Sequence, residues 1–216
     1  MKVAILSESP ADEEGVHILA EAVLGVPIEV TRRKARTGGV DAVLRILPAV
    51  MKEVYYHSDA AGLIAVVDSD QTVAHFPQHE VAGQAVANCR LCELQQLVSR
   101  TRSSLAMVEG RGPLHSAVGL AIPSLEAWCL CGEDHSVSEA TWNNARKHNQ
   151  FPYRPATLKQ RLYGSERPSL DREVQVIRAA MERIVATGSL ALLEQLFDGG
   201  FGSLARQLRT WQATTE

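Results

Sequence analysis

The sequence predicts an α/β fold in which a small parallel sheet is sandwiched by helices, with a helical extension toward the C-terminus. In the first half of the chain, short apolar runs alternate with segments of helical spacing, an order typical of right-handed βαβ crossovers and a parallel sheet. From about Ser138 onward the pattern is only helical. We expect a single domain over residues 1–216, with an α/β core over about 1–135 and a helical extension over about 136–216 packed on it.

Each strand is predicted from an apolar or β-branched run bounded by turn residues. KVAILS (residues 2–7) predicts the first strand and VPIEVTR (26–32) the second. The third, GLIAVVDSD (62–70), is apolar almost without interruption, as expected of a strand covered on both faces. SSLAMVE (103–109) and AVGLAI (117–122) predict one or two more strands.

Helices are predicted between these strands. After Pro10, apolar residues recur at helical spacing behind an acidic first turn, which suits the helix dipole. Further helices are expected at about 40–55 and about 80–101. PSLEAWCLC (123–131) begins another, because its proline suits a first helical turn.

Composition narrows the class of protein. With 45% hydrophobic and 22% charged residues, the chain resembles an ordinary globular protein. Its net charge of −3 gives no general attraction to nucleic acid or to an anionic membrane, so such contact would need a local basic patch. We find no signal peptide, no apolar run of about 18 residues and too few cysteines for a disulfide framework. These features favour a cytoplasmic protein with no membrane contact.

Acidic residues follow two of the predicted strands. Glu8 and Asp12 come after the first strand, and Asp68 and Asp70 after the third, where alternate residues of an extended backbone point to the same side. Ligands of open parallel sheets bind beyond the C-terminal strand ends, so these carboxylates converge if the two strands are neighbours. Gathered carboxylates repel one another unless a cation lies between them, and Mg²⁺ prefers oxygen ligands. Ordinary turn and cap residues remain the alternative.

This combination resembles the TOPRIM domain, in which a glutamate follows the first strand and Asp-x-Asp a later one. Its magnesium-dependent members include topoisomerases, primases and the overcoming-lysogenization-defect nucleases. The nuclease branch usually reads Glu-Gly-x-Thr-Glu; here ESPADE places Glu8 at the first acid and Asp12 where the second would be. Ser9 and Ala11 replace the glycine and the threonine, and Gln71 stands where a glycine is common. These departures indicate either a changed loop geometry or weakened activity.

Nearly the whole chain resembles the TOPRIM-like family called domain of unknown function 4276. Its members tend to show a basic, glycine-containing loop, matched by RRKARTGG, a motif matched by IPSLEAW, and a helix matched by GFGSLARQL. The resemblance implies Glu126 as a further acidic site residue; a first-turn acid on the helix dipole is the alternative. Because the family relative often travels with an ATPase partner, the resemblance also implies the effector of a defence or repair system, such as antiphage defence.

Together these features predict a nuclease that uses Mg²⁺ or Mn²⁺ to hydrolyse phosphodiester bonds. Glu8, Asp68 and Asp70 are the expected catalytic residues, with Glu8 as general base or acid. The alternative is a non-catalytic interaction subunit of an ATPase-containing complex. The expected metal ligands are Glu8, Asp12, Asp68, Asp70 and Glu126. The residues expected to contact the nucleic-acid backbone, unless their loop is merely solvated, are Arg32, Arg33, Lys34 and Arg36.

A second set of metal-binding residue types follows the Asp-x-Asp. It consists of His75, His79, Cys89 and Cys92, which form His-x3-His followed by Cys-x2-Cys and could bind Zn²⁺. Such a site would join the loop after the third strand to the next helix. However, both cysteines would lie on that helix among apolar residues at packing intervals, and small buried cysteines are common. The sequence favours packing over zinc.

Overall fold

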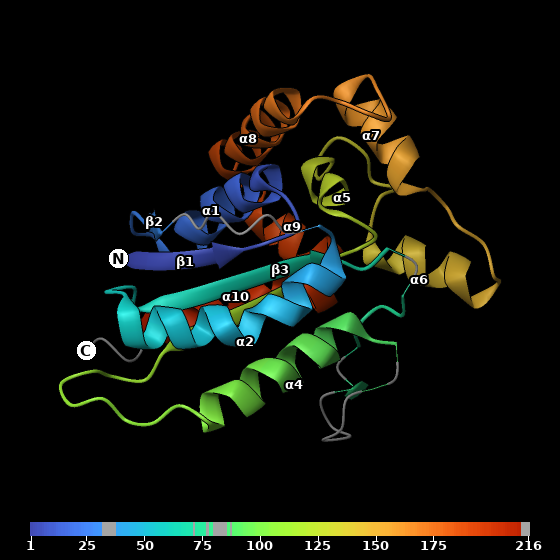
Figure 1. Ribbon diagram of the computed structural model, residues 1–216. Coiled ribbons are helices and arrows are strands. Elements are labelled where there is room, and N and C mark those ends of the chain that lie inside the picture. The colour runs from blue at the N-terminus through green and yellow to red at the C-terminus, as the bar shows by residue number, and fades with distance from the viewer. Residues whose placement is uncertain (32–37, 71, 77, 80–85, 87, 213–216) are drawn as a thin grey trace.

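The computed structural model describes residues 1–31, 38–70, 72–76, 78–79, 86 and 88–212. Within these residues, the centre of the molecule is a sheet of four parallel strands in the order β2-β1-β3-β4 (Figure 1). The strands are β1 (Lys2–Leu6), β2 (Glu29–Thr31), β3 (Gly62–Asp68) and β4 (His115–Ala121).

Helices cover both faces of this sheet. One face carries α1 (Pro10–Leu24) and α10 (Ser203–Gln212), and the other carries α2 (Val40–His57) and α4 (Arg90–Ser103) (Figure 1). The predicted α/β fold with a small parallel sheet between helices is therefore confirmed. Among the described helices, none combines the length and hydrophobicity that crossing a membrane requires. The other helical elements are α5 (Leu125–Cys129), α6 (Glu139–Lys147), α7 (Pro155–Tyr163), α8 (Leu170–Ala186), α9 (Leu190–Leu196) and the π-helical turn η1 (Asp198–Gly202).

The apolar run of β3 is explained by its place inside the sheet. This strand pairs with β1 on one side and β4 on the other; Ala65, for example, lies opposite both Leu6 and Val118. Residues 62–67 are all buried, because helices cover both faces. At Gly62 a side chain would not fit, since the ring of Trp211 lies 2.7 Å from where its Cβ would be.

The strand order reverses between β1 and β3. The crossover from β1 to β2 runs in one direction across the sheet, whereas the crossovers from β2 to β3 and from β3 to β4 run in the other. In open parallel sheets, ligands bind beyond the C-terminal ends of the two strands at such a reversal. Glu8, which follows β1, and Asp68, which ends β3, both lie at this position.

The C-terminal helices pack on the α/β core. α8 lies along α1, and η1 and α10 contact β4 (Figure 1). Gly199 and Gly200 in η1 allow this close approach, because a Cβ at Gly200 would overlap the carbonyl oxygen of Leu120. Their N–H groups donate to the buried carboxylate of Glu139 at 2.8 and 2.7 Å. These bonds hold η1 against α6 as well as against the sheet.

Of the one or two strands expected near residues 103–122, one forms. Residues 103–109 are the end of α4 and a loop, whereas residues 117–122 supply most of β4. Met107 is 96% exposed, so the apolar residues of SSLAMVE do not mark a buried strand here.

The helix expected at about residues 80–101 is present in part as α4, which begins at Arg90, and residues 78 and 79 are also helical. Asn88 has a φ of 62°, in the left-handed region, and Cys89 is an extended N-cap before α4 begins at Arg90. A left-handed residue ends a right-handed helix. Cys89 therefore does not lie on the helix as expected. The predicted segment 80–87 lies outside the described residues except for residue 86.

Candidate functional site

The predicted acidic residues Glu8 and Asp68 meet where β1 and β3 end. The Ser7 hydroxyl donates to the carbonyl oxygen of Val66 at 2.7 Å, which joins the two strand ends. Glu8 then accepts a hydrogen bond through Oε1 from the backbone N–H of Asp68 at 2.8 Å. The predicted convergence required the two strands to be neighbours; β1 and β3 do pair, which brings the two carboxylates to the same end of the sheet.

Asp68 connects β3 to the segment that follows β4. Its Oδ1 accepts the backbone N–H of Leu125 at 3.1 Å, so the end of β3 is bonded to the start of α5. Burial raises the pKa of Asp68 well above its ordinary value of 3.8, and the charges of Asp12 and Glu126 raise it further. Glu8 contributes to the same effect. An ionised Asp68 is therefore costly unless a cation compensates it.

Asp12 lies in the first turn of α1. Ser9 caps this helix, and its Oγ accepts the N–H of Asp12 at 3.2 Å. Burial and then the charge of Glu126 raise the pKa of Asp12 to about 7. Ser9 thus has a local structural role as the N-cap of α1, and burial together with the charge of Glu126 favours the protonated form of Asp12.

Glu126 has defined partners beside the acidic cluster. Its side chain is buried on α5, and Oε1 accepts the hydroxyl of Tyr163 at 3.2 Å. The Lys159 ammonium nitrogen lies 3.5 Å from the same oxygen. Both partners come from α7 and were missed by sequence reasoning, although their i, i+4 spacing on a helix places them on one face. Glu126 therefore does more than complement a helix dipole.

Asp70 differs from the prediction. β3 ends at Asp68, and Asp70 has a φ of 48°, so the two side chains do not share one face of an extended strand. The Asp70 N–H donates to Pro123 O at 2.8 Å, and its half-exposed carboxylate contacts Arg90 Nη1 at 2.7 Å. The same guanidinium nitrogen donates to the carbonyl oxygen of Asp68 at 2.6 Å. Asp70 lies at the rim of the cluster, and Arg90 joins it to β3.

Glu8 is partly exposed. Burial raises its pKa above 4.5, an effect that the hydrogen bond from the Asp68 N–H opposes and the charge of Asp70 reinforces. Gly39 precedes α2 with a φ of 77°, and a Cβ there would lie 3.8 Å from Glu8 Oε2. The start of α2 therefore lies beside the second oxygen of Glu8.

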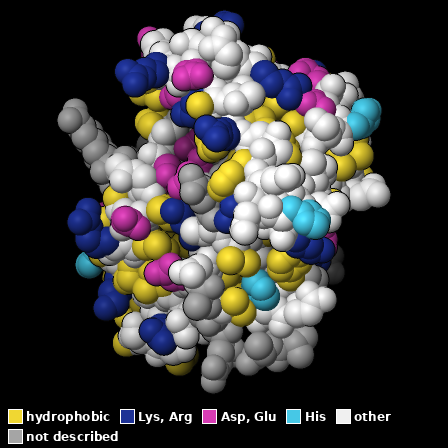
Figure 2. Space-filling view, turned by 90° about the vertical axis from the view of Figure 1, so that its right-hand side faces the viewer, with side chains coloured by type: hydrophobic (Ala, Val, Ile, Leu, Met, Phe, Trp, Pro, Cys, Tyr) yellow, Lys and Arg dark blue, Asp and Glu magenta, His cyan; other side chains and the backbone are white. Residues whose placement is uncertain are grey.

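Figure 2 faces the C-terminal ends of the strands and shows acidic side chains gathered in a recess, with Lys and Arg side chains beside it. The donors in this cluster are carboxylate oxygens, which Mg²⁺ and Mn²⁺ prefer. Burial and mutual repulsion raise the pKa of three of them, Glu8, Asp12 and Asp68. A divalent cation would relieve that repulsion, so the chemistry of these donors suits such an ion. Among the described residues, however, the group whose ligand atoms already lie within 4.8 Å of one another is His75, His79, Cys89 and Cys92.

The predicted basic contacts cannot be placed. Arg32, Arg33, Lys34 and Arg36 lie outside the described residues, as does Gln71. The structure instead brings two other basic residues, Arg90 and Lys159, to the acidic cluster.

The His and Cys residues after β3 also come together. His75 Nδ1 lies 3.6 Å from Cys89 Sγ and 3.5 Å from Cys92 Sγ. His79 Nδ1 lies 3.7 Å from Cys92 Sγ. One ligand atom from each of the four residues lies within 4.8 Å of all the others, a compactness that the sequence argument for packing does not require.

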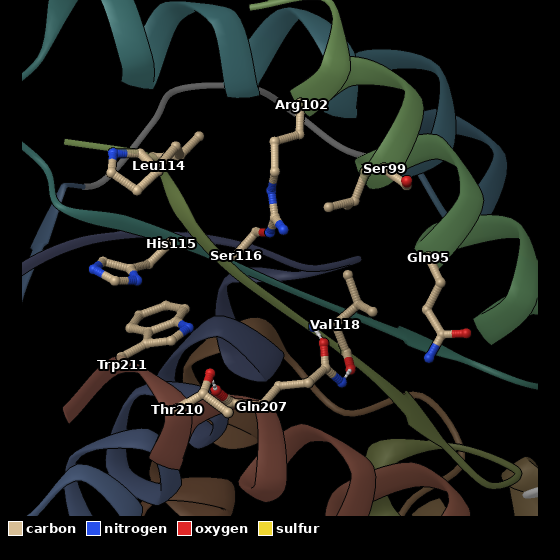
Figure 3. Close-up of a pocket in the computed structure, with 12 residues that line it drawn as sticks. Gln95, Ser99, Arg102, Leu114, His115, Ser116, Val118, Gln207, Thr210 and Trp211 are labelled. Carbon is tan, nitrogen blue, oxygen red and sulfur yellow. Dashed lines mark hydrogen bonds between the residues drawn. The ribbon is translucent and has the colours of Figure 1, made fainter. Parts of the chain in front are cut away.

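A pocket of about 480 Å³ lies beside the edge strand β4, between α4 and α10 (Figure 3). Gln207 of α10 pairs with both the N–H and the carbonyl oxygen of Val118, which closes part of that edge. The rings of His115 and Trp211 lie 5.5 Å apart. None of the carboxylates of the acidic cluster lines this pocket, so the pocket is a feature separate from the candidate site.

Comparison of the chain with protein-family models, with curated proteins and with solved structures found no match.

Proposed function

We propose that this chain is a TOPRIM-like nuclease that uses Mg²⁺ or Mn²⁺ to hydrolyse phosphodiester bonds in nucleic acid. One observation carries the proposal: beyond the ends of β1 and β3, at the reversal of strand order, three further carboxylates lie close enough to Asp68 for their charges to raise its pKa. Without a cation, burial and repulsion favour protonated carboxyl groups there. These four residues are Glu8, Asp12, Asp68 and Glu126.

Those four residues are the proposed ligands, with Asp70 at the rim. A bound divalent cation would supply Lewis-acid activation of water and charge neutralisation at the phosphate. Its binding requires ionised carboxylates, so the protons favoured by burial must leave when the ion enters. The raised pKa of Asp12, about 7, makes that exchange accessible near neutral pH.

The chain supplies a proton acceptor and positive charge around this cluster. Glu8 has one oxygen oriented by the Asp68 N–H, and its raised pKa brings it closer to the range that suits a general base. The Lys159 side chain is 35% exposed, so it can reach a phosphate as well as Glu126. The loop residues after β2 remain proposed contacts of the nucleic-acid backbone, because β2 ends at the same end of the parallel sheet.

The test is cleavage of labelled single- and double-stranded DNA and RNA in Mg²⁺, in Mn²⁺ and in EDTA. Asp68→Asn keeps an oxygen that can accept the Leu125 N–H but removes the charge. Asp134→Asn is the control, since it removes an acid that pairs with Arg161 outside the cluster. We expect metal-dependent cleavage by the wild type and the control. The cleavage rate of Asp68→Asn should fall by more than the roughly 10- to 100-fold that follows removal of an outer-shell partner of a metal, because Asp68 is a proposed direct ligand.

Cleavage that persists in EDTA, or in Asp68→Asn at the wild-type rate, would exclude this site as the catalytic centre. Circular dichroism of each variant shows whether a loss reflects unfolding. Activity on only one of the four substrates would define the preferred nucleic acid.

A second function, that of a non-catalytic interaction subunit of an ATPase-containing complex, is favoured by two ion pairs. Asp70 pairs with Arg90, and Glu126 lies 3.5 Å from Lys159, so internal cations already balance part of the cluster. Isothermal titration with Mg²⁺ and Mn²⁺ separates the two functions. No binding by the wild type would favour the interaction subunit, whereas binding that Asp68→Asn abolishes supports the metal site. The effector role in a defence or repair system is proposed from the resemblance alone.

A further inference from the structure

We propose that His75, His79, Cys89 and Cys92 bind a structural Zn²⁺ ion. The ion would join the segment after β3 to the first turn of α4. This inference does not depend on the proposed nuclease activity, since none of its ligands belongs to the carboxylate cluster.

The distances between the ligand atoms match those of a tetrahedral zinc site. Zn–S bonds are about 2.3 Å and Zn–N bonds about 2.0–2.1 Å, which places sulfur and nitrogen about 3.6 Å apart around one tetrahedral ion. The observed distances are 3.6 Å for His75 Nδ1 to Cys89 Sγ, 3.5 Å for His75 Nδ1 to Cys92 Sγ, and 3.7 Å for His79 Nδ1 to Cys92 Sγ.

Hydrogen bonding between thiols and imidazoles does not explain this arrangement equally well. His75 Nδ1 lies near two sulfur atoms at once, yet an imidazole nitrogen has either one lone pair or one hydrogen to offer. The two imidazole rings are nearly perpendicular, at 86°, and each directs Nδ1 toward Cys92. A single ion between the four atoms satisfies all of them, with each histidine and cysteine supplying one bond.

The composition of the cluster indicates a structural ion. All four positions of a tetrahedral Zn²⁺ would be filled by protein, which leaves none open for water or substrate. His75, Cys89 and Cys92 are also buried, at 3%, 2% and 5% exposure, so solvent has little access to the site. Two thiolate and two imidazole ligands form one of the common structural sets for zinc.

The ion would fix the residues that frame the acidic cluster. Cys89 is the N-cap of α4, and the next residue, Arg90, contacts both Asp70 and the carbonyl oxygen of Asp68. His75 follows Asp70 by five positions in the sequence. Zinc would therefore hold both ends of the segment between Asp70 and Arg90, and with them the position of the Arg90 guanidinium.

The first test uses the full chain without a polyhistidine tag, purified without chelators. Mass spectrometry of the metal content should show one zinc per chain. After replacement by Co²⁺, the protein should show a thiolate-to-cobalt charge-transfer band and the visible bands of tetrahedral cobalt. A wild-type protein that contains no zinc and develops neither set of bands with added Co²⁺ would overturn the proposal, and this measurement needs no variant to fold.

Two variants with matched controls identify the ligands. Cys92→Ala should lose zinc, whereas Cys131→Ala removes a buried thiol outside the cluster and should keep it. His79→Ala should lose zinc to a competing chelator much faster than His135→Ala, which changes an exposed histidine elsewhere. Full zinc retention in both ligand variants would overturn the proposal.

The outcome is separable from that of the nuclease proposal. Asp68→Asn should keep zinc and the thiolate–cobalt band, because carboxylates give no such band. Loss of cleavage with retained zinc would therefore concern the carboxylate site, whereas loss of zinc with retained Mg²⁺ binding would concern the His and Cys site. Zinc that disappears in Asp68→Asn while the protein remains folded would place the ion at the carboxylates and overturn the proposed ligand set.

Discussion

Replacing Asp12 by Asn should raise the free energy of unfolding of the metal-free protein and remove its stabilisation by Mg²⁺. Burial and the charge of Glu126 raise the pKa of Asp12 from 3.8 to about 7. Above that pH, Asp12 is ionised in both states, and the ionised carboxylate has a higher free energy in the folded protein than in the unfolded chain. At ~1.36 kcal/mol for each pKa unit, the difference between the folded and unfolded pKa corresponds to roughly 4 kcal/mol. This value is the upper limit of the increase in the free energy of unfolding that Asp12→Asn can give.

The sign of the pH dependence follows from the same values. A carboxyl group with a higher pKa in the folded state contributes stability that is fully present below its unfolded value and is lost as the pH rises through its folded value. For Asp12 that window runs from 3.8 to about 7. The stability gained in Asp12→Asn should therefore be largest above this window and nearly absent below it.

Thermal and urea unfolding, followed by circular dichroism in EDTA and again in Mg²⁺, measure both effects. At about 2–4 °C for each kcal/mol in a chain of this size, the upper limit of the gain corresponds to a rise in Tm of roughly 8–16 °C. Asp134→Asn is the control and should lower the free energy of unfolding, since hydrogen bonds from Ser136 lower the pKa of Asp134 to about 2. Lower stability of Asp12→Asn than of wild type in EDTA above pH ~7 would refute the reasoning.

Three further substitutions test the local structure, each by urea unfolding. Ser9→Ala should lower the free energy of unfolding by about 1 kcal/mol through loss of the N-cap, and Ser9→Gly by only a few tenths; equal losses would contradict the capping role. Tyr163→Phe should cost about 1 kcal/mol, because it removes a hydrogen bond to the buried Glu126; no change would show that this bond is not made. Gly200→Ala should cost at least about 2 kcal/mol because its Cβ would overlap a backbone carbonyl, whereas Gly38→Ala, in open space, should cost far less; similar losses would argue against the close packing of η1.

Sequence reasoning succeeded where the controlling interactions are local. The apolar run before Asp68 predicted a buried strand, and the structure has β3 there. The acidic residues after the first and third strands were found because they stand at strand ends. The same reasoning failed at Asp70, since its left-handed conformation accompanies bonds to Pro123 and Arg90, which are distant in sequence. It left open whether SSLAMVE forms a strand beside the one from AVGLAI, because apolar composition does not show whether a neighbouring strand is present.

The sequence by itself determined the alternation of strands and helices and the residue types available for the two proposed metal sites. Only the tertiary structure decided which of those residues meet. The strand order β2-β1-β3-β4 brings Glu8 to Asp68, and the packing of α7 brings Tyr163 to Glu126, 37 residues away. Periodicity and caps depend on neighbours within a few residues and can be recognised in the chain. Contacts between remote side chains depend on which elements pack together, and that is a property of the whole fold.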